Sequence, residues 1–277
     1  MLALALLLQS CSAVKLGYSN ITTIAYWWID SFVGFTPEQG KRMRDDLAAL
    51  QQWHRSAELP KYAELLDRMA VQAAGEVTPA QVCAVRDEIR TRLQVLAHEA
   101  EPAMAALSTT LDTDQVETLK KKYARLNAEY RRDWLDTSPE KRTQKRFDQV
   151  VDRGEMVYGR LAEAQRVQIR QYLARSSFDP QTSNAERLRR QQAVLDTLAR
   201  LQADKAGTDA GRQAVARLLA DGFESPDPGY RAYQRTLEKE GCEGIAAMHN
   251  AAPQEQRDMA VRRLKAYAQD ARDLARP

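Results

Sequence analysis

The stretch Thr36-Pro37-Glu38-Gln39 guides our interpretation of this 277-residue chain. A Thr side chain can accept hydrogen bonds from the free N–H groups of a first helical turn. Pro suits the first helical position, and Glu or Gln suits the turn that follows. Related stretches recur at Thr78-Pro79-Ala80-Gln81, Thr113-Asp114-Gln115, Ser138-Pro139-Glu140-Lys141 and Ala252-Pro253-Gln254-Glu255-Gln256. Each stretch predicts the start of a helix.

The composition favours helices throughout. Val and Ile together number 21, which leaves little material for a sheet. Helical spacing of the apolar residues extends outward from each predicted start. The expected helices are 20–33, 37–56, 58–74, 79–107, 113–135, 139–176, 181–204, 208–221, 228–249 and 253–275. We therefore predict an all-α fold of about nine to ten helices, forming one elongated domain over residues 11–277.

The longest predicted helix spans residues 139–176. At about 1.5 Å per residue it would be some 55 Å long, which is why we expect an elongated body. Gly154 and Gly159 interrupt this helix and mark where a kink can form. The stretch Ser176-Ser177-Phe178-Asp179-Pro180 ends it.

The charges argue against several classes of function. Lys and Arg total 41 against 38 for Asp and Glu, a net charge of +3, and the two signs are interleaved along the chain. This pattern does not predict a nucleic-acid-binding surface. Three His and three Cys are too few to predict a multi-ligand metal site or a cysteine-based catalytic centre. We expect neither a cofactor nor a metal.

No local motif predicts catalysis. His54, His98 and His249 each stand alone, and the sequence contains neither a Gly-rich phosphate loop nor a Gly-x-Ser-x-Gly elbow. Acidic residues are spaced to pair with basic residues one helical turn away, as in Glu88 and Arg92. We expect no catalytic residue, although an active site could still assemble from residues far apart in sequence.

The amino terminus predicts export. Met1 to Leu8 are all apolar, a run too short to span a membrane but typical of a signal peptide over residues 1–10 with a truncated start. Leu8-Gln9-Ser10-Cys11 resembles a bacterial lipobox, which implies that Cys11 is the lipid attachment site. Because Ser12 and not Asp follows Cys11, the resemblance implies the outer membrane, facing the periplasm. The alternative is an apolar terminus with an incidental Cys.

The aromatic residues Tyr26, Trp27 and Trp28 lie in a predicted helix that is apolar on nearly all sides. Such a helix must be buried, either in protein or in lipid. A membrane-proximal position would suit the amphipathic rings, which collect at membrane interfaces. We expect the core instead, because the stretch holds too few residues for both roles.

Cys83 and Cys242 are the two thiols that would remain after lipid attachment at Cys11. In an oxidising cell envelope an even pair is a candidate disulfide. The alternative is two unrelated small buried residues. A bridge would require the carboxyl-terminal helices to fold back onto the first third of the chain.

Several stretches at the two ends of the chain suggest a family. They are Cys11, Lys15-Leu16-Gly17-Tyr18-Ser19-Asn20, Tyr26-Trp27-Trp28-Ile29-Asp30, Thr36-Pro37-Glu38-Gln39, Cys242, Met248-His249-Asn250, Gln256-Arg257, Leu264-Lys265-Ala266-Tyr267 and Asp270. The sequence resembles a group of Gram-negative envelope lipoproteins classified only by a domain of unknown function. That resemblance implies an exported lipoprotein and carries no known activity.

A weaker likeness is to Spy-type periplasmic chaperones, whose helices begin with Leu-Thr-x-x-Gln motifs. Phe35, Val77 and Leu111-Asp112 stand here in place of that Leu. Because most of the motif is helix-capping chemistry, it says little about function.

Our leading hypothesis is a non-enzymatic, lipid-anchored envelope protein that binds other proteins or polypeptide segments, as a scaffold or chaperone-like protein. The expected partners are the membrane, through the lipid, and other envelope proteins. The alternative is an enzyme acting on envelope material such as peptidoglycan or lipid, and a third hypothesis is a structural spacer. An apolar concavity without converging titratable groups favours binding, whereas a polar pocket with a buried carboxylate pair or His favours an enzyme.

Overall fold

The structure is a computed structural model that describes residues 13–276. Every regular element in this part of the chain is helical, which confirms the predicted all-α class, and there are twelve α-helices where nine to ten were expected. The predicted signal peptide and Cys11 lie outside the described residues. The helices are α1 (Ala13–Ser19), α2 (Ile21–Val33), α3 (Pro37–Ala57), α4 (Leu59–Gln72), α5 (Pro79–Ser108), α6 (Thr113–Tyr130), α7 (Pro139–Tyr158), α8 (Glu163–Arg175), α9 (Pro180–Ala203), α10 (Thr208–Phe223), α11 (Pro228–Asn250) and α12 (Gln254–Ala275), with a π-helical turn η1 (Arg131–Leu135) after α6.

Side-chain caps begin the helices where the sequence predicted them. The Thr36 hydroxyl accepts a hydrogen bond from the Gln39 N–H at 3.3 Å, and the Gln39 side chain accepts one from the Thr36 N–H at 3.0 Å. Thr78 caps α5 in the same reciprocal way. At the third site the cap is Asp112 and not the expected Thr113, because the Asp112 carboxylate accepts from the Gln115 N–H at 2.8 Å.

The single helix predicted over residues 139–176 is wrong. It is divided into α7 and α8 because Gly159 has φ +71°, a left-handed conformation that ends the helix and that glycine adopts readily. The chain then turns so that Leu161 is buried, and the Leu161 N–H donates to the Glu155 carboxylate at 3.2 Å. Arg166 of α8 also pairs with Glu155 at 2.7 Å, which holds the turn closed.

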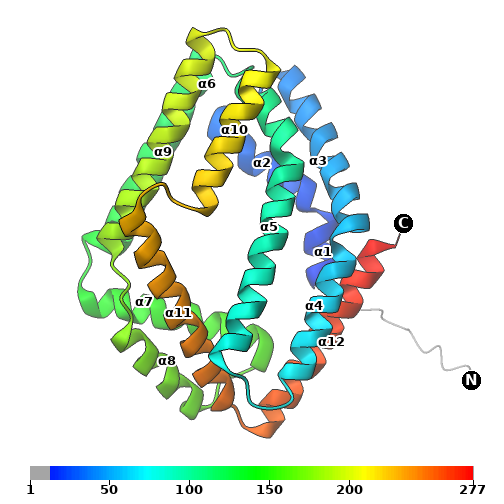
Figure 1. The fold of residues 1–277 in the computed structure, drawn as a ribbon, viewed down its shortest axis with the longest axis vertical. Helices are drawn as coiled ribbons and strands as arrows, with labels where there is room; N and C mark the ends of the chain where they lie inside the picture. Colours follow the sequence, from blue (N-terminus) through cyan, green and yellow to red (C-terminus); the bar gives the residue numbers. More distant parts are fainter. Residues whose placement is uncertain (1–12, 277) are drawn as a thin grey trace, which may run out of the picture.

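The first and last helices of the described chain, α1 and α12, contact each other. Figure 1 shows how the helices between them are arranged. From the amino terminus the chain follows α1 to α4 along one side, and α5 returns through the middle of the molecule. α6 and α9 form the opposite side, and α7 and α8 lie at the lower end. The last helix, α12, packs along α4, and Lys15 of α1 reaches it to pair with Asp273 at 2.6 Å. These contacts join the first and last helices of the described residues.

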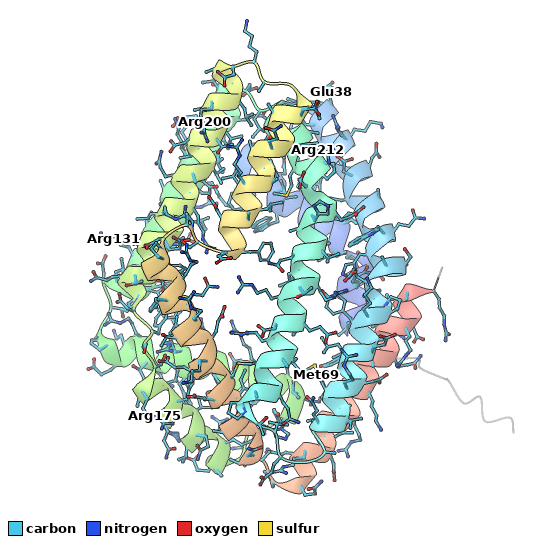
Figure 2. The ribbon with its side chains drawn as sticks, in the orientation of Figure 1. Glu38, Met69, Arg131, Arg175, Arg200 and Arg212 are labelled. Carbon is cyan, nitrogen blue, oxygen red and sulfur yellow. A yellow bond between two sulfur atoms is a disulfide. The ribbon has the colours of Figure 1, made fainter. Side chains whose placement is uncertain are left out.

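The apolar core is divided into clusters. One joins α2, α6 and α9 around Val33, Leu119 and Leu198, and another joins α7, α8 and α11 around Val151, Ile169 and Met248. The labelled side chains Glu38, Arg131, Arg175, Arg200 and Arg212 in Figure 2 lie on the surface. No helix among residues 13–276 is both long enough and apolar enough to cross a membrane.

Candidate functional site: an apolar cavity between α5 and α11

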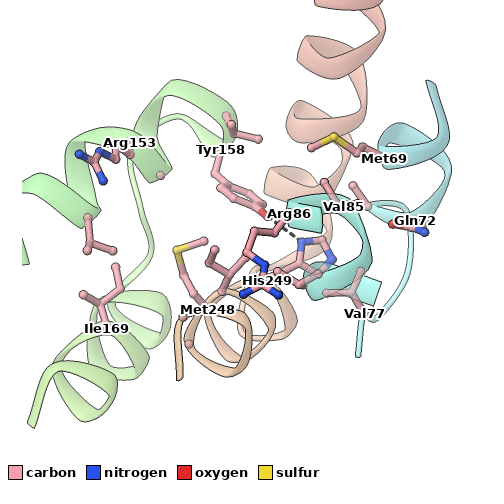
Figure 3. Close-up of a pocket in the computed structure, with 18 of the residues that line it drawn as sticks. Met69, Gln72, Val77, Val85, Arg86, Arg153, Tyr158, Ile169, Met248 and His249 are labelled. Atoms are coloured by element: carbon pink, nitrogen blue, oxygen red, sulfur yellow. Dashed lines mark hydrogen bonds between the residues drawn. The ribbon is translucent and has the colours of Figure 1, made fainter. Parts of the chain in front are cut away.

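A cavity of about 600 Å³ lies where α4, α5, α7, α8, α11 and α12 meet (Figure 3). Its volume is within the range of small-molecule and side-chain binding pockets. Most of its walls are aliphatic, methionine or glycine residues: Met69, Ala73, Val77, Val82, Val85, Ile89, Val150, Gly154, Val157, Ile169, Gly241, Gly244, Ile245, Met248 and Leu264. The remaining lining residues are Gln72, Arg86, Arg153, Tyr158, Tyr172 and His249. Neither Asp nor Glu is among the lining residues, so the cavity has no carboxylate for acid–base chemistry.

His249 lies in the cavity wall, and both of its ring nitrogens are used. Nε2 lies 2.7 Å from the Gly75 carbonyl, and Nδ1 lies 2.8 Å from the Tyr158 hydroxyl (Figure 3). Since a carbonyl can only accept, Nε2 carries the proton, and Nδ1 accepts a hydrogen bond from Tyr158. Burial lowers the pKa of His249 and raises the pKa of Tyr158 to about 12, so both groups are neutral near pH 7.

His249 and Asn250 together hold the loop between α4 and α5. While His249 donates to Gly75, the Asn250 side chain accepts from the Val77 N–H at 2.9 Å and donates to the Val77 carbonyl at 3.0 Å. The preceding residue, Met248, faces the cavity. The stretch Met248-His249-Asn250 therefore builds the cavity wall, and its histidine has a positioning role.

Two arginines line the cavity, and only one of them has an ion-pair partner among the described residues. Arg86 pairs with Glu238 at 2.8 Å, so its charge is balanced across α5 and α11. Arg153 on α7 is exposed and has neither an ion pair nor a hydrogen bond with any residue from 13 to 276. It is an unpaired positive charge among lining residues that are mostly apolar.

A disulfide joins Cys83 of α5 to Cys242 of α11, with Cα atoms 5.4 Å apart and a sequence separation of 159. This distance is within the roughly 7 Å limit for a bridge. The neighbouring residues Val82 and Gly241 line the cavity, so the bridge fixes two of its walls relative to each other.

Two glycines of α11 face different surroundings. A Cβ atom at Gly244 would lie 2.8 Å from the Tyr172 ring, so that close packing requires glycine. A Cβ atom at Gly241 would meet nothing within 4 Å, although Gly241 lines the cavity. Packing therefore explains the first glycine, whereas the second leaves space open in the cavity.

A family model for a family of unknown function, DUF6279, matches residues 31–221, which is more than half of the chain. The chain belongs to the DUF6279 family. No curated protein and no solved structure gave a match. In this DUF6279 protein the matched range includes the cavity walls of α4, α5, α7 and α8 and ends before α11.

The three histidines of this DUF6279 protein lie apart. The His54 ring nitrogen Nδ1 is hydrogen-bonded to the Tyr18 hydroxyl at 2.9 Å. Burial lowers the pKa of His54. His98 is exposed on α5, 3.5 Å from Glu101. No group of three or more His, Cys, Asp or Glu residues that could hold a metal occurs among residues 13–276.

The predicted pairing of Glu88 with Arg92 is wrong. Glu88 pairs with Arg68 of α4 at 2.6 Å, and Arg92 lies 3.5 Å from the fully buried Glu58. Arg92 reaches the junction of α3 and α4 because the buried carboxylate of Glu58 needs cations nearby to offset its loss of water.

The predicted core position is correct for Tyr26 and wrong for Trp27 and Trp28. Tyr26 is buried and packs against Phe35, whereas the two Trp side chains are 61% and 64% exposed. The helix packs through one face only, so residues on its other face remain uncovered despite their apolar character.

Proposed function

We propose that this protein is an exported, lipid-anchored and non-enzymatic binding protein of the cell envelope. We further propose that its cavity between α5 and α11 receives apolar side chains of other polypeptides. The observation that supports binding is a 600 Å³ cavity with a largely apolar lining and no carboxylate. An apolar concavity of this kind gains free energy when it removes apolar groups from water.

Three features of the cavity suit a polypeptide ligand. Met69 and Met248 supply flexible, polarisable side chains that adapt to different apolar shapes. Ile89 and Ile245 line the cavity yet remain exposed, so apolar surface continues out of the cavity toward solvent. A ligand can therefore insert a side chain and still contact the surface on both sides of the opening.

The alternative of an enzyme acting on peptidoglycan or lipid receives less support. A polar pocket with a buried carboxylate pair, or with a histidine free to exchange protons, would favour an enzyme over a binding protein. His249 is the one histidine of the described chain that lines this cavity, and both its nitrogens have internal partners. Its geometry suits a structural role.

The proposed location rests on the lipobox-like stretch before Cys11 and agrees with the Cys83–Cys242 disulfide, because disulfides persist in oxidising compartments. We propose attachment at Cys11 to the outer membrane, facing the periplasm. The Cys11→Ser variant should be released from the membrane fraction or accumulate as an unprocessed precursor. A variant that still carries fatty acid and remains in that fraction would contradict the assignment.

The cavity is tested by filling it. In Gly241→Leu the new side chain occupies open space, and Gly222→Leu provides a matched control on α10, because a Cβ atom there also meets nothing within 4 Å and Gly222 is not a lining residue. Binding is measured by fluorescence anisotropy of a labelled peptide rich in Leu and Phe, with a fatty acid as competitor. We expect Gly241→Leu to weaken peptide binding at least about tenfold, equivalent to about 1.4 kcal/mol, and Gly222→Leu to leave it unchanged.

Three results would contradict this proposal. They are no peptide binding by the wild-type protein, equal peptide binding by both glycine variants, and displacement of the peptide by fatty acid at far lower concentration than by unlabelled peptide. The last result would assign the cavity to lipid.

A further inference from the structure

The outer face of α1 and α2 carries no charge. Between Ala13 and Val33 the only charged residues are Lys15 and Asp30. Lys15 reaches α12, where it lies 2.6 Å from Asp273 and 3.3 Å from Asp270. Asp30 accepts a hydrogen bond from the Phe35 N–H at 2.7 Å, at the end of its own helix. Both charges are therefore engaged within the protein, in a chain in which 29% of the residues are charged.

Large apolar side chains occupy this uncharged face. Ile24, Trp27 and Trp28 lie at helical spacing on α2 and are all more than half exposed. The exposed apolar residues of the two helices are Val14, Leu16, Ile21, Ile24, Trp27 and Trp28, and we call them the α1–α2 apolar face. The opposite side of α2 packs inward through Tyr26 and Val33. Single exposed apolar residues are ordinary on a protein surface, but several large ones at helical spacing, as on α2, mark an interaction site.

The position of this face in the chain identifies what covers it. Cys11 precedes the first residue of α1 by two positions, so a lipid on Cys11 holds α1 close to the bilayer surface. The 13 residues of α2 are too few to span a bilayer, so this helix can only lie along the interface. Trp rings favour this interface because they combine a large apolar surface with one hydrogen-bond donor.

A basic residue lies at the edge of the face. Lys122 of α6 donates to the Ser31 hydroxyl at 2.9 Å and lies 4.7 Å from the centre of the Phe32 ring. Anionic lipid headgroups would be attracted to its charge. The apolar residues thus suit the acyl-chain side of the membrane interface, and the flanking cation suits its headgroup side.

We infer that the α1–α2 apolar face lies in the headgroup interface of the bilayer, with Trp27 and Trp28 inserted, and that this contact orients the folded body on the membrane. The inference rests on the proposed anchor at Cys11, and the following test separates the two. With Cys83 and Cys242 joined in the disulfide, Cys11 is the only other cysteine of the chain. In protein made without residues 1–10, which the cell does not lipidate, a maleimide-bearing lipid can therefore be coupled to the free Cys11 thiol, so the test does not depend on lipid attachment by the cell.

The measurement is tryptophan quenching on vesicles of phosphatidylethanolamine and phosphatidylglycerol that contain lipids brominated at shallow or deep acyl positions. The chain has four Trp residues. The double variant Trp53→Phe/Trp134→Phe keeps the proposed membrane pair, and Trp27→Phe/Trp28→Phe keeps the other pair as a control. We expect the membrane pair to shift its emission to shorter wavelength and to be quenched more strongly by shallow bromine than by deep bromine. The control pair should change little.

A charge placed on the face gives a second readout. Ile24→Asp should reduce quenching of the membrane pair by at least half, whereas Val71→Asp, at an exposed apolar residue of α4, should not. Circular dichroism verifies that each variant is folded. The inference is overturned if the membrane pair is not quenched in vesicle-coupled protein, or if both Trp pairs are quenched equally. It is also overturned if the membrane pair shifts its emission without vesicles as protein concentration rises, because a second copy then covers the face.

Discussion

Replacing two glycines of α11 by alanine should change the stability of the protein in opposite directions. Gly→Ala within a helix gains about 0.5–1 kcal/mol, because alanine has less backbone freedom to lose on folding. At Gly241 nothing offsets this gain, since the new methyl group meets no atom within 4 Å. At Gly244 the methyl group would lie 2.8 Å from ring carbons of Tyr172, and such overpacking costs about 1–3 kcal/mol.

Gly241→Ala should therefore raise the free energy of unfolding by about 0.5–1 kcal/mol, and Gly244→Ala should lower it by about 1–2 kcal/mol. Both values follow from urea unfolding monitored by circular dichroism, provided that the slope with urea is the same in both variants. The two sites lie three residues apart on one helix, so helix propensity cancels in the comparison.

Gains of equal size at both positions would refute the reasoning, because the Tyr172 ring would then not contact Gly244. A loss at Gly241 would show that the space beside it is filled in solution. The second result would remove the structural basis for the cavity.

Three further predictions concern the disulfide and two buried titratable groups. Replacing Cys83 and Cys242 by Ser should lower the free energy of unfolding by up to about 5 kcal/mol, the loop-entropy value for a separation of 159 residues. Two reactive thiols in denatured, non-reduced protein from the envelope would contradict the bridge. Burial raises the pKa of Glu186, but hydrogen bonds from two arginines outweigh it and hold the pKa at about 2, below the usual 4.5. Glu186 therefore contributes about 2 kcal/mol, after solvent screening, to the free energy of unfolding above about pH 4.5, and this contribution is lost toward pH 2. In Glu186→Gln the free energy of unfolding should fall less steeply over this pH range. Because burial lowers the pKa of His249 below 6.5, stability should fall as the pH drops through 6.5, and less so in His249→Gln; identical pH profiles would contradict this.

The capping chemistry was readable from the sequence because it is local. Thr36, Thr78 and Ser138 each cap a helix that begins one residue later, as predicted. The break at Gly159 was not resolved from sequence, because a glycine inside a helix and one that ends it look alike. Gly154 continues α7, whereas Gly159 adopts a positive φ.

The cavity could not be predicted in the same way. Val82, Val85 and Ile89 have the spacing of core residues on α5, and the walls of a cavity and a filled core produce the same apolar pattern. Whether these residues line a cavity or pack into a filled core depends on how six helices meet. Gly241 offers a weak signal, since it lies inside a predicted helix without a turn to explain it.

The exposure of Trp27 and Trp28 also could not be predicted from the sequence pattern. An apolar helix indicates burial but does not say whether protein or lipid covers it. The packing of α2 through Tyr26 leaves the two Trp side chains outward.

Site-specific photo-crosslinking in intact cells tests the central claim that the cavity binds polypeptides. A photoreactive amino acid at Ile245, a cavity residue that is 53% exposed, should form protein crosslinks that disappear when Gly241→Leu fills the cavity. The same amino acid at Val71, an exposed position outside the cavity lining, should not give these products. Crosslinks to lipid alone, no crosslinks from Ile245, or protein crosslinks that persist in Gly241→Leu would contradict the account.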